Sequence, residues 1–335
     1  MSWAFTPDVE QRLHAFLANR GLATGPIEIS RIGEGHSNLT FRVRSGGRAV
    51  VLRRPPPPPL PPGSNDVLRE AMFIGAVEGR GVPVPKLLAT GQAGDVFDVP
   101  FFVMDMVDGV VITDVLPSAL SAAGTPRLLA EAMVDAMAAL HRVDWRAAGL
   151  ADAGRPEGFN ARHLHRIARI VTEADGEIAP EFVGLYRWLS AHVPPESGSA
   201  IVHNDFRLGN LMWDRAAPPR LAAALDWELA TIGDPLLDLA YLVTAMPQQG
   251  VCRTPVQDLA AALVAPDLPD AATICGRYFA ATGSAPQPLA WHAVMVNWKL
   301  AALYRYSRLR GEDAYFADRC HEARFLAEAE RWCPK

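Results

Sequence analysis

The stretch IVHNDFRLGNLMWD, residues 201–214, largely decides how the fold of this chain is interpreted. Three polar side chains, His203, Asp205 and Asn210, lie between apolar runs at its two ends. Polar groups that become buried must find hydrogen-bonding partners, because an unpaired polar group inside a protein costs free energy. The stretch is therefore either a structural loop held together by its own polar groups or a working site.

A second polar group follows a second apolar run. The run LAAAL leads directly into Asp226, sixteen residues after Asn210. Phosphoryl transfer needs metal ligands, a carboxylate that orients or deprotonates the acceptor hydroxyl, and donors that hold the triphosphate. Carboxylate and amide oxygens are suitable ligands for Mg2+, so the spacing favours this chemistry. The alternative is that these residues only cap loops.

The pattern of apolar residues predicts a β-rich N-terminal part followed by a mainly helical part. The fold class expected is α+β, with a small antiparallel sheet before the helices. Strands are expected at Ile27–Ile32, Leu39–Val43, Ala49–Leu52, 82–90, 98–107, Ala200–His203 and Leu221–Asp226, and helices at 7–20, 66–78, 160–172, 179–192, 235–246, 256–264, 270–282, 288–307 and 312–331. A further helix is expected to begin after Thr125 as its N-cap, with Pro126 at its first position.

A chain of 335 residues is long for one hydrophobic core and suggests about two domains. The turn at Asp108-Gly109 is the best boundary between them. We therefore predict a β-rich N-terminal lobe over residues 1–107 and a helical C-terminal lobe over residues 108–335. The proline-rich segment at 53–63 is expected to be an extended surface connector, or alternatively a ligand for a proline-binding partner.

Composition excludes several classes of protein. A formal net charge of -5 gives no basic footprint for nucleic acid. The four cysteines show no spacing typical of zinc ligands. The first residues lack the apolar core of a signal peptide, and no apolar stretch is long enough to span a membrane. A cytoplasmic protein without a nucleic-acid or membrane partner is expected.

These motifs together resemble the aminoglycoside phosphotransferase and choline-kinase family, which has a two-lobe, protein-kinase-like fold. The resemblance is carried by VHNDFRLGNLMWD and LDWELATIGDPLLDLAYL and covers roughly residues 25–310. It implies that residues 1–107 form a nucleotide-binding lobe and that residues 108–335 carry the catalytic loop and the acceptor site. It also implies that ATP and Mg2+ are the cofactors, that Asp205 is the catalytic aspartate, and that Asn210 and Asp226 are magnesium ligands. His203 would belong to the catalytic loop and fix it through side-chain hydrogen bonds.

The segment RIGEGHSNLTFRV, residues 31–43, resembles the nucleotide-binding loop of that family. Gly33 and Gly35 would let the backbone approach phosphate closely, and Ser37 and Asn38 would add donors. Asn38 stands where a third glycine is usual, so the motif is incomplete. A plain hairpin turn is the alternative.

The next strand should carry a lysine for the α and β phosphates, but it carries Arg53 and Arg54. Strand alternation points these two arginines to opposite faces. Glu70 lies on the apolar face of the helix over 66–78 and needs a cationic partner. We therefore predict that Arg53 pairs with Glu70. Because arginine is not equivalent to lysine, the choice between ATP and GTP, and between Arg53 and Arg54, stays open.

Further residues have predicted roles. Met104, Asp105 and Met106 in PFFVMDMVDG resemble the linker whose backbone binds adenine. We expect Asp234 to cap a helix and Asp238 to brace the catalytic loop, rather than to bind metal. Glu228 is an alternative ligand for a second metal ion.

The family resemblance implies that the phosphate acceptor is the hydroxyl of a small molecule. GHSNLTF, VLRRPP and VPVPKLL resemble the kinase-like domain associated with acyl-CoA dehydrogenases, which implies a hydroxyacyl-CoA acceptor and a functional link to such an enzyme. Arg162, Arg166 and Arg169 would share a helix face able to meet CoA phosphates, or would form an ordinary solvated face. Aminoglycosides, amino alcohols and sugars are alternative acceptors. A nucleotide-binding pseudokinase with a regulatory role is the rival function.

Overall fold

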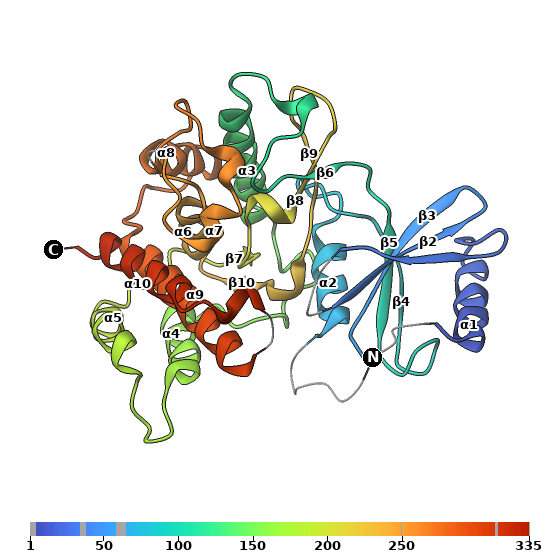
Figure 1. Cartoon of the computed structure of the whole chain (residues 1–335), viewed down its shortest axis with the longest axis horizontal. Coiled ribbons are helices and arrows are strands. Elements are labelled where there is room, and N and C mark those ends of the chain that lie inside the picture. Colours follow the sequence, from blue (N-terminus) through green and yellow to red (C-terminus); the bar gives the residue numbers. More distant parts are fainter. Residues whose placement is uncertain (1–4, 34–37, 58–64, 249, 312–313, 335) are drawn as a thin grey trace. The chain divides into compact units, whose positions relative to one another are not determined.

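The computed structural model describes residues 5–33, 38–57, 65–248, 250–311 and 314–334. The chain forms two compact units (Figure 1), and the first changes to the second after Asp108. The first unit contains residues up to Gly79, Pro83–Asp108 and the later segment Ala223–Leu229. The second unit contains Arg80–Val82, Gly109–Ala222 and the chain from Ala230 onwards. Because the segment Ala223–Leu229 belongs to the first unit, Asp226 and Glu228 lie in the unit that contains the sheet.

The first unit is built on a five-stranded antiparallel sheet with the strand order β1-β2-β3-β5-β4. In β2, alternate residues from Leu39 to Ser45 are buried, as expected for a strand with one face towards a core. The elements of this unit are α1 (Pro7–Ala18), β1 (Glu28–Arg31), β2 (Leu39–Ser45), β3 (Arg48–Arg54), α2 (Val67–Val77), β4 (Leu87–Gly91), β5 (Phe101–Asp105) and the 3-10 turn η4 (Trp227–Leu229).

One face of this sheet forms a core with α1. Leu13 and Leu17 of the helix are buried with Phe41, Leu52 and Phe101 of the strands. Helix α1 begins at Pro7, where Thr6 accepts a hydrogen bond from the backbone N–H of Val9. Apolar burial of this kind is the main driving force for folding, so α1 is held by the sheet rather than by its own propensity.

The segment Ala223–Leu229 is tied to the rest of the first unit by a backbone hydrogen bond, and a side-chain hydrogen bond within the segment shapes it. The backbone N–H of Ala224 donates to the carbonyl oxygen of Pro83 at 2.8 Å. Trp227 is buried, and its indole Nε1 donates to the carbonyl oxygen of Ala224 at 3.0 Å. These contacts fix the turn that presents Asp226, whose φ of 64° lies in the left-handed region.

The second unit is mainly helical and has a core around α9. Trp298 of α9 is fully buried together with Phe182 and Phe325, and its indole Nε1 donates to the carbonyl oxygen of Phe182. The helices are α3 (Thr125–His141), α4 (Phe159–Ala168), α5 (Pro180–Ala191), α6 (Pro235–Ala245), α7 (Pro255–Asp258), α8 (Ala271–Thr282), α9 (Ala290–Arg310) and α10 (Cys320–Trp332). The 3-10 turns are η1 (Ser118–Leu120), η2 (Arg169–Val171), η3 (Leu208–Asn210), η5 (Ala261–Leu263) and η6 (Ala314–Ala317).

Short strands frame the loop that the sequence singles out. β7 (Ala200–Val202) runs into this loop and pairs antiparallel with β10 (Thr231–Gly233). β8 (Leu211–Trp213) leaves the loop and pairs antiparallel with β6 (Val110–Val111). β9 (Leu221–Ala224) begins in this unit beside β8. The loop is therefore anchored at both ends by strand pairing.

The expected β-rich and helical parts are confirmed, but several boundaries were wrong. The helix expected at 312–331 is instead the turn η6 followed by α10, and the helix expected at 256–264 is the short α7 followed by η5. Thr125 is not an N-cap, because Gly124 occupies that position with a φ of 83°. Most of the proline-rich segment, residues 58–63, lies outside the described residues.

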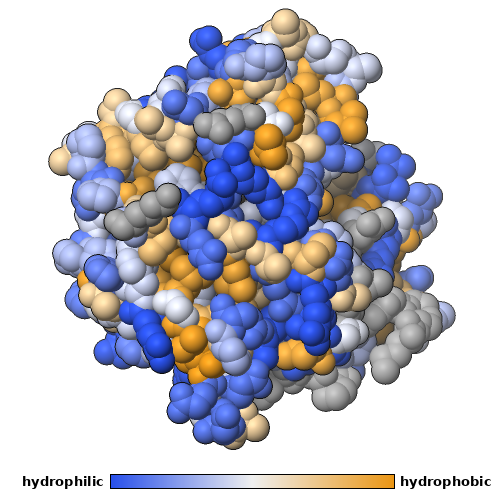
Figure 2. All heavy atoms as spheres, turned by 60° about the vertical axis from the view of Figure 1, so that its left-hand side comes forward, coloured by the Kyte–Doolittle hydropathy of each residue, from blue (hydrophilic) through white to orange (hydrophobic). Residues whose placement is uncertain are grey.

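The side of the molecule that comes forward in Figure 2 shows a mosaic of hydrophilic residues and hydrophobic patches. Within the residues that the structure describes, no helix is both long enough and apolar enough to cross a membrane.

The close packing of β4 against β5 can be tested at Gly91. A Cβ added there would lie 2.2 Å from the ring of Phe101, which is fully buried. We expect Gly91→Ala to lower the free energy of unfolding by about 2 kcal/mol, because an overfilled core must shift. Gly25→Ala in the same unit is the control: a Cβ there meets nothing within 4 Å, so its effect should stay within about 0.5 kcal/mol. Equal effects in urea unfolding would contradict this packing.

Candidate functional site

The loop that follows β7 is held by one buried carboxylate. Asp238 of α6 is fully buried and accepts hydrogen bonds from the backbone N–H groups of His203 at 2.5 Å and of Asn204 at 2.7 Å. His141 Nε2 lies 3.3 Å from the same carboxylate. Asn204 has a φ of 66°, a conformation that needs support from its surroundings. The expectation that Asp238 braces this loop is confirmed.

Burial and hydrogen bonding act in opposite directions on Asp238. Burial favours the neutral acid, but the hydrogen bond and the charge of His141, with the hydrogen bond from the His203 backbone, outweigh it. The pKa of Asp238 is therefore lower than its ordinary value of 3.8. The group is ionised at neutral pH, and its charge is what holds the loop.

Asp205, the predicted catalytic residue, lies within this loop among several donors. Asn210 Nδ2 donates to Asp205 Oδ2 at 2.7 Å and to its backbone carbonyl oxygen at 2.9 Å. The hydroxyl of Tyr241 donates to Asp205 Oδ1, and Arg207 Nε lies 3.4 Å from the same oxygen. The Asp205 side chain keeps 21% of its surface exposed, so it remains accessible to a ligand.

His203 is fully buried and faces inward. Its Nδ1 accepts a hydrogen bond from the backbone N–H of Asp205 at 3.3 Å, and its ring packs edge-on against Phe206. This geometry agrees with the predicted role of fixing the loop through hydrogen bonds. A part in the chemistry itself stays a prediction.

Two further residues near Asp205 escaped the sequence analysis. Tyr241 is buried on α6, and its pKa lies well above the usual range because of burial and the neighbouring Asp205 carboxylate. Lys299 is buried on α9, with its Nζ 5.7 Å from the Tyr241 ring centroid. Burial lowers the pKa of Lys299, against the opposing pull of Asp205 and Asp238. The sequence feature that could have drawn attention to Lys299 is its position as a charged residue within the apolar run of α9.

Asp234 is the N-cap of α6, as expected. Its Oδ1 accepts from the backbone N–H of Leu236 at 3.0 Å, while its Oδ2 accepts from Asn160 Nδ2 at 2.8 Å and lies 3.2 Å from His292 Nε2. Burial would raise the pKa of Asp234, but hydrogen bonds from His292, Ser197 and Asn160 lower it to about 2. Its bonding is saturated, which supports a structural role.

In the first unit, Arg53 is surrounded by three carboxylates. Its Nε donates to Glu70 Oε2 at 2.8 Å, which confirms the predicted pairing. Its Nη2 donates to Asp226 Oδ1 at 2.8 Å and lies 3.4 Å from Glu228 Oε2. Although burial opposes the charge, these three carboxylates together raise the pKa of Arg53. The contacts with Asp226 and Glu228 span more than 170 residues of sequence and were not anticipated.

Glu70 is 2% exposed and titrates unusually. Burial raises its pKa to about 7, against the attraction of Arg53, and Asp226 and Glu228 add to the rise. Arg54 points to the other face, as alternation predicted: it is 7% exposed and lies over the rings of Phe41 and Phe97. Of the two arginines, Arg53 is the one that meets the acidic residues.

The glycine-containing loop is described only at its ends. Gly33 has a φ of 74°, a conformation that glycine adopts without strain. Asn38 is buried, donates from Nδ2 to Glu228 Oε2 at 3.1 Å, and accepts from Asn65 Nδ2 at 3.1 Å. Gly35 and Ser37 lie outside the described residues. The nucleotide-binding roles of all four stay predictions.

The predicted adenine-binding residues lie at the end of β5. Met104 pairs with Val51 of β3, and the backbone N–H of Asp105 donates to the carbonyl oxygen of Lys86. Asp105 also forms an exposed ion pair with Arg48 at 3.4 Å. Met106, just beyond the strand, is 40% exposed. The contacts with adenine stay a prediction.

The residues expected to bind Mg2+ have suitable chemistry. Asn210 uses its amide nitrogen for Asp205, which leaves the hard amide oxygen for a ligand. Asp226 gives one oxygen to Arg53 and keeps its side chain 34% exposed. An amide oxygen and a carboxylate oxygen fit the preference of Mg2+ for oxygen ligands. Asn210 lies in the second unit and Asp226 in the first.

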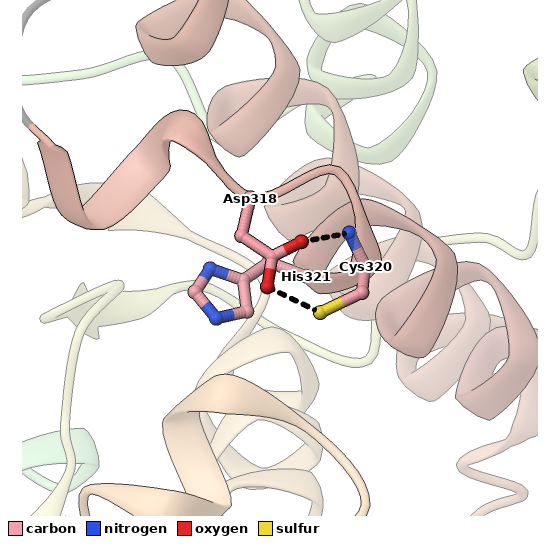
Figure 3. A group of neighbouring side chains, drawn as sticks. All are labelled: Asp318, Cys320 and His321. Carbon is pink, nitrogen blue, oxygen red and sulfur yellow. Dashed lines mark hydrogen bonds between the residues drawn. The ribbon is translucent and has the colours of Figure 1, made fainter.

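Another group of possible metal ligands lies at the start of α10. Figure 3 shows Asp318, Cys320 and His321 as neighbours, with ligand-type atoms within 4.8 Å of one another. Asp318 accepts hydrogen bonds from the backbone N–H and the thiol of Cys320, both at 2.8 Å. The thiol bond raises the pKa of Cys320, so the thiol keeps its proton. A local aspartate turn leading into the helix accounts for this arrangement, and we assign no ion to it.

Comparison with known proteins settles the family. The profile of the phosphotransferase enzyme family APH matches residues 28–273. The chain belongs to this family. The predicted family resemblance is thereby confirmed, and so is the kinase-like fold with its antiparallel sheet and helical C-terminal region. The same kind of domain also occurs in larger proteins named for acyl-CoA dehydrogenase activity.

Among sequence relatives, the chain is 35% identical over 219 residues to acyl-CoA dehydrogenase family member 11 from Gallus gallus. The match covers 65% of this chain and 28% of the chicken protein. The chain thus spans less than a third of the length of such relatives, so it resembles one part of them.

Solved structures agree over nearly the whole chain. A candidate aminoglycoside phosphotransferase from Ralstonia eutropha has a TM-score of 0.77 and 26% identity, with 96% of this chain and 98% of that chain covered. A thermostable mutant of aminoglycoside phosphotransferase APH(4)-Ia, in ternary complex with ADP and hygromycin B, has a TM-score of 0.61 and 16% identity, with 98% and 100% covered. At 16% identity, the similarity to the APH(4)-Ia structure supports the fold alone.

The role of Asp238 can be tested by Asp238→Asn. An amide lacks the charge and the second acceptor oxygen that the His203 and Asn204 backbones require, so we expect a loss of about 3 kcal/mol in the free energy of unfolding. Because the pKa of Asp238 is lowered, this difference from wild type should shrink as the pH falls below about 4. Urea unfolding of the two proteins measures it.

The matched control is Asp135→Asn, which removes an ion pair to Arg277 from a side chain that is 51% exposed. This exchange should cost less than about 1 kcal/mol. Similar losses for the two variants would contradict the special role of Asp238.

The raised pKa of Glu70 predicts a pH dependence of stability. A carboxyl with a higher pKa in the folded protein binds a proton on folding, so its stabilising contribution is lost as the pH rises from about 5 to about 8. Wild type should therefore lose stability over that range relative to Glu70→Gln, which has no such proton. Urea unfolding at several pH values provides the comparison, and a constant difference between the two proteins would refute the shift.

Proposed function

We propose that this phosphotransferase-family protein transfers the γ-phosphoryl group of ATP to the hydroxyl of a small molecule. The observation that carries the proposal is the loop from His203 to Asn210, in which a partly exposed Asp205 carboxylate is oriented by Asn210 and Tyr241. A carboxylate held in this way can accept a proton from an acceptor hydroxyl or align it for in-line attack.

Asp205 is the residue that contacts the acceptor. Arg207 and Lys299 place positive charge near its carboxylate. Tyr241 and Asn210 each use one Asp205 oxygen, so the carboxylate keeps a defined orientation. Asn210 and Asp226 would hold Mg2+, which supplies charge neutralisation for the phosphate oxygens when bound.

The nucleotide contacts are assigned to the first unit. Arg53 would hold the α and β phosphates, because a guanidinium can bind two phosphate oxygens at once. Glu70 orients it through the 2.8 Å hydrogen bond. Gly33, Gly35, Ser37 and Asn38 would contribute backbone and side-chain donors, and Met104, Asp105 and Met106 would face adenine. ATP is the nucleotide that we propose, and GTP is the alternative.

For the acceptor, we propose a hydroxyacyl-CoA. Support comes from the relatives named as acyl-CoA dehydrogenase family members, which share this domain. A functional link to an acyl-CoA dehydrogenase follows from the same likeness. Aminoglycosides are the alternative, favoured by the structural likeness to aminoglycoside phosphotransferases. Amino alcohols and sugars complete the panel of acceptors to be tested.

A regulatory nucleotide-binding role without catalysis is the rival proposal, because arginine replaces the expected lysine at position 53. It predicts binding of Mg·ATP without ADP release for every acceptor. The geometry around Asp205 and Asn210 favours an active enzyme instead.

Asp205→Asn separates these proposals. We expect it to lower the rate of ADP release with a productive acceptor by at least about a thousandfold, because the base is lost. The rise in Tm caused by Mg·ATP should persist, because ligand binding stabilises the folded state. Asp214→Asn, an exchange at an exposed position outside this loop, should retain full turnover. Full turnover by Asp205→Asn would rule out its catalytic role, and loss of the Tm shift would indicate a structural role.

A further inference from the structure

A hollow of about 400 Å3 in the second unit is lined by an unusual concentration of arginines. Arg155, Arg162, Arg166 and Arg169 all contribute to its wall. An adjoining hollow of about 430 Å3 shares the last three of them. All four side chains come from α4 or the segments directly before and after it, and all four are exposed enough to meet a ligand.

The arginines of this pocket have no paired carboxylate within the part of the chain that the structure describes. Among the described residues, none of these four arginines forms an ion pair with a carboxylate, whereas arginines elsewhere on the second unit do, such as Arg277 with Asp135. Arg162 instead donates to the backbone carbonyl oxygens of Arg155 and Glu157. Clustered like charges without paired counter-charges repel each other, so the binding of an anion lowers the free energy of the site.

The pocket is also built to hold one arginine in place. Arg166 Nη2 donates to His163 Nδ1 at 2.7 Å. His163 is 5% exposed and stacks on the ring of Phe159. Burial, together with the charges of Lys299 and Arg166, lowers the pKa of His163 well below its usual range, so the ring is neutral and can accept this hydrogen bond. Arg166 is thus oriented without losing its charge.

The inner wall of the pocket is connected to the loop of Asp205. Thr231 and Ile232 of β10 line the hollow, and Thr231 pairs with Val202, the last residue of β7 before that loop. Lys299 provides a second link, because its charge acts on both His163 and Asp205. A ligand in the pocket therefore lies close to the residues that would meet the acceptor.

We propose that the arginine pocket is a binding site for a diphosphate or phosphomonoester group, distinct from the site of the nucleotide's phosphates. Four guanidinium groups around a hollow offer paired N–H donors that match phosphate oxygens in geometry and charge. The apolar faces of Phe159 and Ile232 supply a surface for the organic part that carries the phosphate. A concave site of this size suits a small ligand better than an acidic protein surface.

The direct test is binding of inorganic pyrophosphate, measured by calorimetry without Mg2+ and with no turnover required. We expect wild type to bind, and the double variant Arg162→Gln/Arg166→Gln to bind at least tenfold more weakly, since each lost charged hydrogen bond weakens binding. Arg187→Gln, at an exposed position on α5 in the same unit, is the matched control and should bind like wild type. Circular dichroism confirms that each variant is folded.

Arg53→Gln identifies any pyrophosphate bound at the nucleotide site instead. Loss of binding in Arg53→Gln with full binding in Arg162→Gln/Arg166→Gln would overturn the proposal, as would no binding by wild type. The result does not depend on catalysis, so it can fail or succeed separately from the proposed kinase activity.

Two sources of the phosphate group are distinguished by kinetics. If the acceptor carries it, the double variant should raise KM at least tenfold for a phosphate-bearing hydroxyl acceptor and leave KM unchanged for its counterpart without phosphates. If a free anion is the ligand, pyrophosphate should change the rate with the phosphate-free acceptor in wild type and not in the double variant. Either pattern supports the site, and identical kinetics of the two proteins in both assays would contradict it.

Discussion

A single buried carboxylate is the constraint on which the second unit depends. Asp238 is fully buried, and a charge in that position is tolerated only when donors surround it. The donors are two successive backbone N–H groups, of His203 and Asn204, and the ring of His141. Because the loop backbone satisfies the carboxylate and the carboxylate fixes the loop, neither can move alone. Asp205, in the same loop, stays partly exposed.

In the first unit, the main electrostatic feature is a group of acidic residues around Arg53. Arg53 faces Glu70, Asp226 and Glu228, so one positive charge meets three acidic groups. The excess negative charge suits a cation, and the pKa of Glu70, raised to about 7, shows how strongly burial and crowding act on this cluster. Magnesium with a nucleotide would relieve the crowding around Asp226 while leaving Glu70 to orient Arg53. The nucleotide contacts proposed for Arg53 and Asp226 therefore depend on the electrostatics of this cluster.

The sequence predicted what depends on local periodicity and missed what depends on distant contacts. Strand alternation placed Arg53 and Arg54 on opposite faces and helix spacing showed that Glu70 needs a cationic partner, but only the structure shows that Arg53 is that partner. The acidic cap at Asp234 follows from local rules. Nothing local indicated that Ala223–Leu229 would join the first unit, because its partners at Pro83 and Arg53 are far away in sequence. Tyr241 and Lys299 were overlooked because they lie in apolar helices. The prediction of one helix over 312–331 was wrong because the apolar spacing continues through the turn η6, so the sequence pattern does not show where α10 begins.

The central claim is that the Asp238 carboxylate holds the backbone of the loop that carries Asp205. Hydrogen exchange of the His203 and Asn204 amides, measured by NMR on the intact chain at neutral pH, tests it most directly. If the claim holds, both amides are among the slowest to exchange in wild type, and the replacement of Asp238 by asparagine accelerates both by at least about a hundredfold while amides in the core of α9 keep their rates. Fast exchange of these two amides in wild type, or unchanged rates after the replacement, would contradict the account.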